Sequence, residues 1–217
     1  MQKNRSVLFF TVVVLLLIAF GCKSGANETV ALPNASADQT SAPKNYDTKI
    51  KVKTPDEQTV VEVKTDTDPK IEYGGKIVRS ETKADKRKYS VEGANQIAEV
   101  KVKDADGFKL RTIDGKLLWK VKITADKIKI SDNEENENAF EIKKKDDGAK
   151  IERTEKKLGE VKFYKDRQKV KVKDANDAEL FDSNTDKYSV AFGVLALSEI
   201  PEDLRFIIFA ELLARNL

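Results

Sequence analysis

The side chains that could do chemistry in this chain are few in kind. Its 217 residues include no histidine and one cysteine, Cys22. Without imidazole there is no histidine base, no histidine metal ligand and no Ser-His-Asp triad. If Cys22 is consumed by an attachment, cysteine nucleophiles, disulfides and zinc–thiolate sites are excluded too. We therefore expect a protein that is not an enzyme and that uses no cofactor or metal.

Cys22 has a specific place in the sequence. It follows an apolar run over residues 12–21, and Lys3 and Arg5 precede that run. This order, with a small residue before the expected cleavage site, predicts a signal peptide over residues 1–21. The cysteine at the cut resembles the lipobox cysteine of bacterial lipoproteins. That resemblance implies that Cys22 is the lipid attachment site and the new N-terminus.

Two other interpretations of this leader stay open. One is an uncleaved anchor helix, for which residues 7–20 are short beside the ~20 needed to span a bilayer. The other is secretion without a lipid. In each case the rest of the chain is exported, to a bacterial cell envelope if the lipoprotein interpretation holds. Lys23, where Asp would argue for retention at the inner membrane, favours the outer membrane in a diderm host.

The carboxylates offer two candidate cation sites. Asp104, Asp106 and Gly107 resemble the opening of an EF-hand loop, but position twelve, where that loop needs Glu, is Gly115. We therefore expect a plain turn. The second candidate is one polar loop that holds several acids, and we expect it to be solvated. Its acids are Asp132, Glu134, Glu135 and Glu137. No pair of acids stands out for hydrolase chemistry.

Lysines at strand spacing form the other conspicuous pattern. They are Lys101, Lys103, Lys120, Lys122, Lys127, Lys129, Lys143, Lys145, Lys171 and Lys173. We expect them to form a solvated exterior whose charges protect strand edges, with anionic lipid or envelope polymers as the alternative partners. The net charge of +3, with acids and bases interleaved, argues against nucleic acid. Trp119, the single tryptophan, is expected in the core.

The elements that must position these residues begin after a linker. Residues 22–48 are rich in small and polar residues, the composition of a flexible tether. Alternating apolar and polar residues over 49–64 then predict a hairpin. The polar stretch 66–69 leaves open whether residues 49–69 are an extra hairpin or part of the domain over 70–217.

Short alternating segments continue to residue 188. We expect strands over 77–80, 88–91, 98–103, 108–111, 117–123, 127–130, 140–143, 149–152, 161–164, 170–173 and 179–181. Asp106-Gly107, Asp114-Gly115 and Asp147-Gly148 are hairpin-turn signals. The pattern predicts an antiparallel meander with one apolar and one charged face.

The last thirty residues supply a cover for the apolar face. Residues 190–197 are apolar on all sides, which is typical of a core helix. Pro201, Glu202 and Asp203 form a good helix start. We expect this second helix to pack against the mouth of the barrel.

The hairpins and the apolar C-terminal segment together resemble the tubby-like superfamily, which includes LURP-one-related proteins and phospholipid scramblases. The match rests on residues 101–107, 114–121 and 191–200. The resemblance implies a mainly β fold: a closed antiparallel barrel of about a dozen strands around a hydrophobic C-terminal helix. It implies phosphoinositide binding in that family, but no residue here can be matched to a lipid-binding site.

The sequence therefore predicts a non-catalytic, lipid-anchored cell-envelope protein that acts as a binding or structural module at the membrane. The first alternative is a membrane-active protein whose C-terminal apolar segment inserts into lipid. The second is a carrier of a small apolar ligand, which would require the C-terminal helix to lie outside the barrel.

Overall fold

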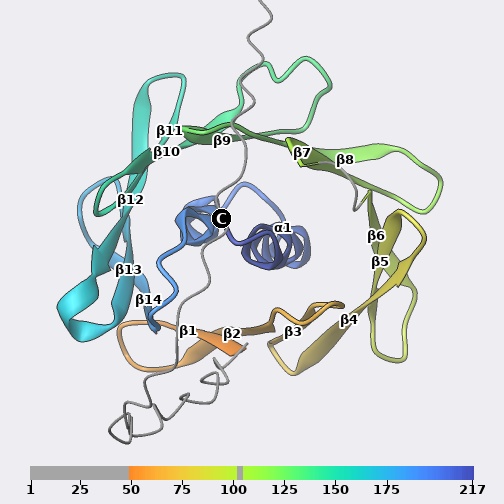
Figure 1. The fold of residues 1–217 in the computed structure, drawn as a ribbon, viewed down its shortest axis with the longest axis horizontal. Coiled ribbons are helices and arrows are strands. Elements are labelled where there is room, and N and C mark those ends of the chain that lie inside the picture. Colours follow the sequence, from red (N-terminus) through yellow and green to blue (C-terminus); the bar gives the residue numbers. More distant parts are fainter. Residues whose placement is uncertain (1–48, 102–104) are drawn as a thin grey trace, which may run out of the picture. The chain divides into compact units, whose positions relative to one another are not determined.

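A computed structural model describes residues 49–101 and 105–217. Cys22, Lys23, the signal peptide expected over 1–21 and the linker expected over 22–48 lie outside the described residues. The described part forms a closed antiparallel barrel with helical segments inside it (Figure 1).

Fourteen strands make up the barrel. They are β1 (Lys49–Lys53), β2 (Thr59–Lys64), β3 (Lys70–Tyr73), β4 (Lys76–Lys83), β5 (Lys86–Val91), β6 (Gln96–Lys101), β7 (Gly107–Arg111), β8 (Leu117–Ile123), β9 (Lys127–Ser131), β10 (Phe140–Lys145), β11 (Gly148–Arg153), β12 (Lys156–Tyr164), β13 (Lys169–Asp174) and β14 (Glu179–Asn184). Each strand pairs with its neighbours in the sequence, so the predicted meander is confirmed.

The barrel closes between its first and last strands. β1 pairs antiparallel with β14, and Lys53 lies opposite Asp182. The hairpin formed by β1 and β2 is therefore part of the barrel, which is why the strands number fourteen. We call the end at which β1 begins, at Lys49, the entry end, and the opposite end the distal end.

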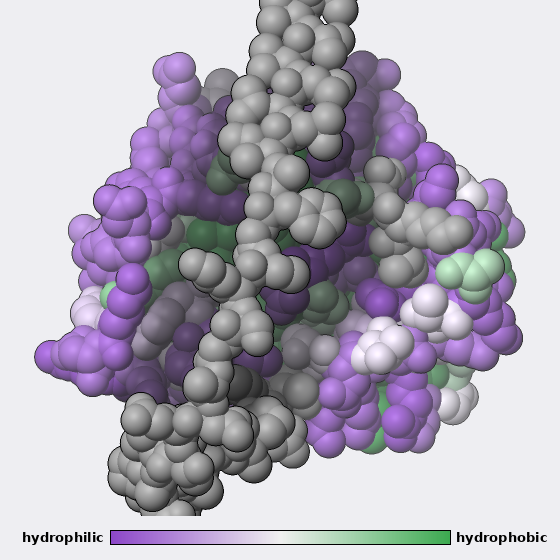
Figure 2. All heavy atoms as spheres, viewed as in Figure 1, coloured by the Kyte–Doolittle hydropathy of each residue, from purple (hydrophilic) through white to green (hydrophobic). Residues whose placement is uncertain are grey.

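Alternation along the strands separates the two faces of the sheet. In β1, Ile50 and Val52 point inward and are buried, while Lys49 and Lys51 are exposed. The pattern recurs in β13, where Val170 and Val172 are fully buried. Since successive strand residues face opposite sides, the sequence period of two places the apolar face inside and lysines and glutamates outside. Figure 2 shows this arrangement as a hydrophilic rim around deeper hydrophobic residues.

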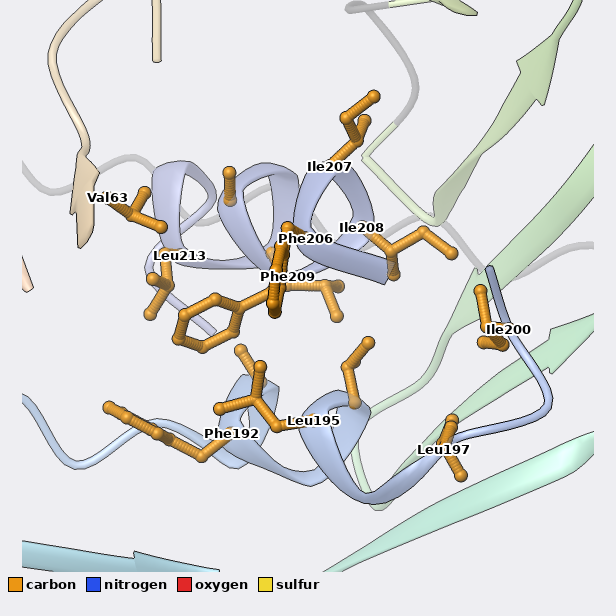
Figure 3. Close-up of a cluster of buried hydrophobic side chains, with 14 of the residues drawn as sticks. Val63, Phe192, Leu195, Leu197, Ile200, Phe206, Ile207, Ile208, Phe209 and Leu213 are labelled. Atoms are coloured by element: carbon orange, nitrogen blue, oxygen red, sulfur yellow. The ribbon is translucent and has the colours of Figure 1, made fainter. Parts of the chain in front are cut away.

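Two C-terminal segments occupy the interior. The first is the 3₁₀ helix η2 (Val190–Ala196), and the second is α1 (Glu202–Ala214). Residues 206–213 of α1 are all buried. The two segments pack on each other, with the rings of Phe192 and Phe209 5.2 Å apart and edge-to-face (Figure 3). A second and shorter 3₁₀ helix, η1 (Lys165–Arg167), connects β12 to β13 and has no buried residues.

The position of α1 corrects one expectation. The helix begins directly after Pro201, as predicted, but it lies inside the barrel and not against its mouth. The interior of a barrel widens as strands are added. The wider barrel therefore accommodates α1 on the side of β2 and β3, and η2 on the side of β10–β13.

Close approaches within the fold depend on glycine. Gly193 of η2 lies so near Ile142 of β10 that a Cβ there would come within 2.9 Å of the Ile142 side chain. At the β10–β11 turn, a Cβ on Gly148 would lie 1.9 Å from the carbonyl oxygen of Val161. The predicted Asp147-Gly148 turn is therefore present, and it needs glycine for space as well as for backbone freedom.

Candidate functional site

The outer face carries a repeated cluster of one carboxylate between lysines of neighbouring strands. Glu141 in β10 lies 2.9 Å from Nζ of Lys129 and 3.3 Å from those of Lys127 and Lys143. Burial alone would raise the pKa of Glu141, but hydrogen bonds from the three lysines outweigh it and lower the pKa to about 2. This carboxylate is therefore ionised across the whole physiological range.

Other strands repeat the arrangement. Glu152 lies between Lys143 and Lys150, and Glu62 lies between Lys49 and Lys51. The pKa of each glutamate is lowered by hydrogen bonds from its lysines. The exterior is thus a lattice of alternating charge, which favours solubility over attraction of one sign of ligand.

The predicted lysine pattern divides into two groups. Lys127, Lys129, Lys143 and Lys171 pair with carboxylates, and Lys120 donates to the backbone carbonyl of Glu134. Within the described residues, no ion pair forms at Lys101, Lys122, Lys145 or Lys173. Lys103 lies outside the described residues.

The acidic loop is held together by its own amides and by neighbouring cations. Asn133 donates to the carbonyl of Glu137 at 2.9 Å and accepts from its backbone N–H at 2.9 Å. Glu134 pairs with Lys109 at 2.7 Å and with Arg111 at 3.2 Å. Among the described residues, no three side chains suited to bind a metal lie together. The four acids share a loop without forming a common site.

The turn that resembled a calcium loop is described only in part. Asp104 lies outside the described residues. The carbonyl of Asp106 accepts a hydrogen bond from the backbone N–H of Ile123 at 2.8 Å, which ties the turn to β8. Gly107 opens β7, and Gly115 sits in the β7–β8 turn with a φ of 83°.

Trp119 lies at the edge of the core. Its side chain is half-buried and packs against the core, and its ring centroid is 6.3 Å from that of Phe140. The core position expected for this residue is therefore confirmed in part, because the side chain packs against the core but is not fully buried.

A buried charged cluster inside the barrel escaped the sequence analysis. Glu211 of α1 is completely buried, and its Oε1 accepts hydrogen bonds from Nη1 of Arg87 at 2.8 Å and from the Tyr89 hydroxyl at 2.6 Å. Its Oε2 lies 3.6 Å from Nε of Arg215, one helical turn later. We call Glu211, Arg87, Tyr89 and Arg215 the Glu211 cluster.

Arg87 connects this cluster to the barrel wall. Its Nη2 donates to the carbonyl of Thr67 at 2.9 Å, and its Nε donates to Oγ1 of Thr82 at 3.1 Å. Burial would lower the pKa of Arg87, but the charge and hydrogen bond of Glu211, together with smaller effects of Tyr89, outweigh burial and raise that pKa. For Tyr89, burial and the neighbouring Glu211 both raise the pKa well above its ordinary value. The phenol therefore stays protonated and donates to Glu211.

The sequence did contain a signal for this cluster. Glu211 is the single acid within the apolar run 206–213, so a helix buried on all sides must bury it. Arg87 and Tyr89 share the inward face of β5 by alternation. A buried charge needs an opposite charge nearby. The buried place of Glu211 and the inward place of Arg87 therefore together predict their pairing.

The other end of α1 is attached by a second polar contact. The hydroxyl of Tyr73, at the end of β3, donates to Oδ1 of Asp203 at 2.6 Å, and Lys76 lies 3.4 Å from the same oxygen. Burial and this carboxylate raise the pKa of Tyr73. Both ends of α1 are thus bonded to the β3–β5 side of the wall.

No helix among the described residues combines the length and the apolar character that a membrane crossing requires. Comparison with known proteins gave no match to any family model, to any curated protein or to any solved structure.

Proposed function

We propose that this chain is a non-catalytic, lipid-anchored protein of a bacterial cell envelope that acts as a binding or structural module at the membrane surface. The observation that carries the proposal is the filled barrel. Its interior holds α1 and η2, including the fully buried Phe209 and Val194, so the exterior and the two ends are the surfaces open to a partner. Lipid attachment at Cys22 would hold these surfaces near a membrane.

The entry end of the barrel carries charges of both signs. This mixture supports the lipid, and not the barrel surface, as the main attachment to the membrane. Lys101 and Lys145 end β6 and β10 there, and Lys122 is close by in β8. These lysines are the candidates for contact with anionic lipid headgroups or envelope polymers. However, turns at the same end carry Asp126 and Asp147, so we expect the barrel alone to bind such surfaces weakly.

The same geometry bears on the two alternatives. A carrier in which the ligand replaces the helix would need α1 outside the barrel, whereas α1 lies inside it. Insertion of the C-terminal segment into lipid would require α1 to leave the barrel and Glu211 to lose Arg87 and Tyr89. Membership in the tubby-like superfamily remains a proposal, supported by the closed barrel around α1.

The test is to express the full chain in a bacterium with radiolabelled palmitate and to separate membrane from soluble fractions. Cys22→Ser is the informative variant, and Ser24→Ala is the matched control. We expect the wild type and the control to be labelled and membrane-bound, and Cys22→Ser to lose the label. Equal labelling of Cys22→Ser would refute the anchor. Turnover of a substrate by the wild type would refute the non-catalytic role.

A further inference from the structure

A cavity lies at the distal end of the barrel, at the opposite end from the lysines and aspartates considered above. It has a volume of about 380 Å³ and lies where β10, β12 and β14 begin, against the segment that links η2 to α1. Small-molecule sites usually occupy about 300–1,000 Å³. The size therefore falls within the range of ligand sites.

The walls of this cavity are largely apolar. They come from strands at one side and from the interior segments at the other: Phe140, Leu158, Leu180, Phe181, Leu195 and Leu197. Phe140, Leu195 and Leu197 are buried, and the other three are half-buried. Such a surface selects a hydrocarbon chain over a polar molecule.

One cation, Arg205 of α1, lines the same cavity. Its Nε is buried and has no hydrogen-bond partner, and within the described residues Arg205 makes no ion pair. The guanidinium of Arg205 lies over the ring of Phe206, and its central carbon is 5.6 Å from the ring centre. Burial lowers the pKa of Arg205, although the charge of Glu202 partly offsets this effect. A buried donor without a partner is uncommon in folded proteins.

The acids at the cavity are occupied elsewhere. Glu199 pairs with Nη1 of Arg153 at 2.6 Å, and the carboxylate of Asp174 accepts from the backbone N–H groups of Asn176 and Ala178. Arg205 is therefore the charged group left to meet a ligand. These two carboxylates would repel a doubly charged headgroup more strongly than a singly charged one.

We infer that this cavity binds a single-chain fatty carboxylate, with the acyl chain among the apolar side chains and the carboxylate on the guanidinium of Arg205. A guanidinium presents parallel N–H donors that match the two oxygens of a carboxylate. The inference goes beyond the proposed function and does not depend on the anchor at Cys22.

The experiment uses the full chain in membranes and a photoactivatable dodecanoate with its reactive group at the chain end. Crosslinked peptides are mapped by mass spectrometry, and unlabelled dodecanoate and dodecanol serve as competitors. We expect adducts on the segments that carry Leu180 or Leu195, displacement by dodecanoate, and little displacement by dodecanol. Adducts spread evenly over the chain, or equal competition by dodecanol, would overturn the inference.

Two variants locate the site. Arg205→Gln removes the cation, and Ala175→Trp fills the rim from an exposed position. Arg167→Gln, at an exposed arginine in η1, is the matched control. We expect labelling to fall about tenfold in Arg205→Gln, which loses the charge-assisted contact with the carboxylate. We expect a similar fall in Ala175→Trp, which loses the space for the acyl chain. If Arg205→Gln impairs folding, Ala175→Trp still tests the site. Unchanged labelling of Ala175→Trp would contradict binding in this cavity.

Discussion

The hydroxyl of Tyr89 lies 2.6 Å from Oε1 of Glu211, a residue 122 positions later in the chain. Arg87 approaches the same oxygen at 2.8 Å, so a charged and a neutral donor join β5 to α1 inside a core that is largely apolar. This relationship fixes the depth and rotation of α1 in the barrel, because an unpaired Glu211 or Arg87 would be a buried charge without compensation.

Removing one partner of this pair should destabilise the protein strongly. We expect Glu211→Leu to lower the free energy of unfolding by about 3–5 kcal/mol, since it leaves the guanidinium of Arg87 buried and unpaired. The double variant Arg87→Met with Glu211→Leu should recover part of that loss. Chemical denaturation of the three proteins measures the effect, with the exposed Glu81→Gln as the control. A double variant no more stable than Glu211→Leu would show that the pair is not the reason for the loss.

The interior segments should be needed for folding. A chain that ends at Asp186 lacks η2 and α1, and its barrel would expose inward side chains such as Ile142 and Ile151 to water. We expect this truncation to lose its cooperative thermal transition and to aggregate, because a closed sheet needs a filled interior. Circular dichroism melts and light scattering provide the measurement. A truncated chain that melts cooperatively and stays soluble would mean that α1 is peripheral to stability.

Acid should lower the stability of the protein by protonating Glu141 on the outer face. The pKa of this carboxyl is lowered from 4.5 to about 2 in the folded protein, so folding favours its charged form. The resulting stability is fully present above the unfolded pKa and is lost as the pH falls from about 4.5 to about 2. We expect Glu141→Gln to be less stable than wild type at pH 7 and to approach it at pH 2. Denaturant midpoints at several pH values test this, and a difference independent of pH would contradict it.

Gly148 should not tolerate a side chain. A Cβ at this position would meet the carbonyl oxygen of Val161 at 1.9 Å, so β11 and β12 must move apart. We expect Gly148→Ala to lower the free energy of unfolding by about 1–3 kcal/mol. Gly75→Ala is the control, because Gly75 also has a positive φ but open space around it. Equal losses in the two variants would assign the effect to backbone conformation and not to the contact.

The sequence alone determined the local features of this protein. Alternation such as Ile50 and Val52 between lysines marks inward and outward positions, because that period is a property of every extended strand. The Asp-Gly turn signals and the helix start at Pro201 are likewise local, since each depends on a few neighbouring residues. These signals were enough to predict an antiparallel barrel with an apolar C-terminal segment.

Only the tertiary structure decided how distant parts meet. Four features join residues that are far apart in the chain. They are the closure of β1 on β14, the place of α1 inside the barrel, the pairing of Arg87 with Glu211 and the cavity at Arg205. Local patterns pair consecutive strands, but they do not tell whether the first strand meets the last or how much volume the closed sheet encloses. The number of strands sets that volume, and the volume decides which apolar segment fits inside and which charged side chains it must bring with it.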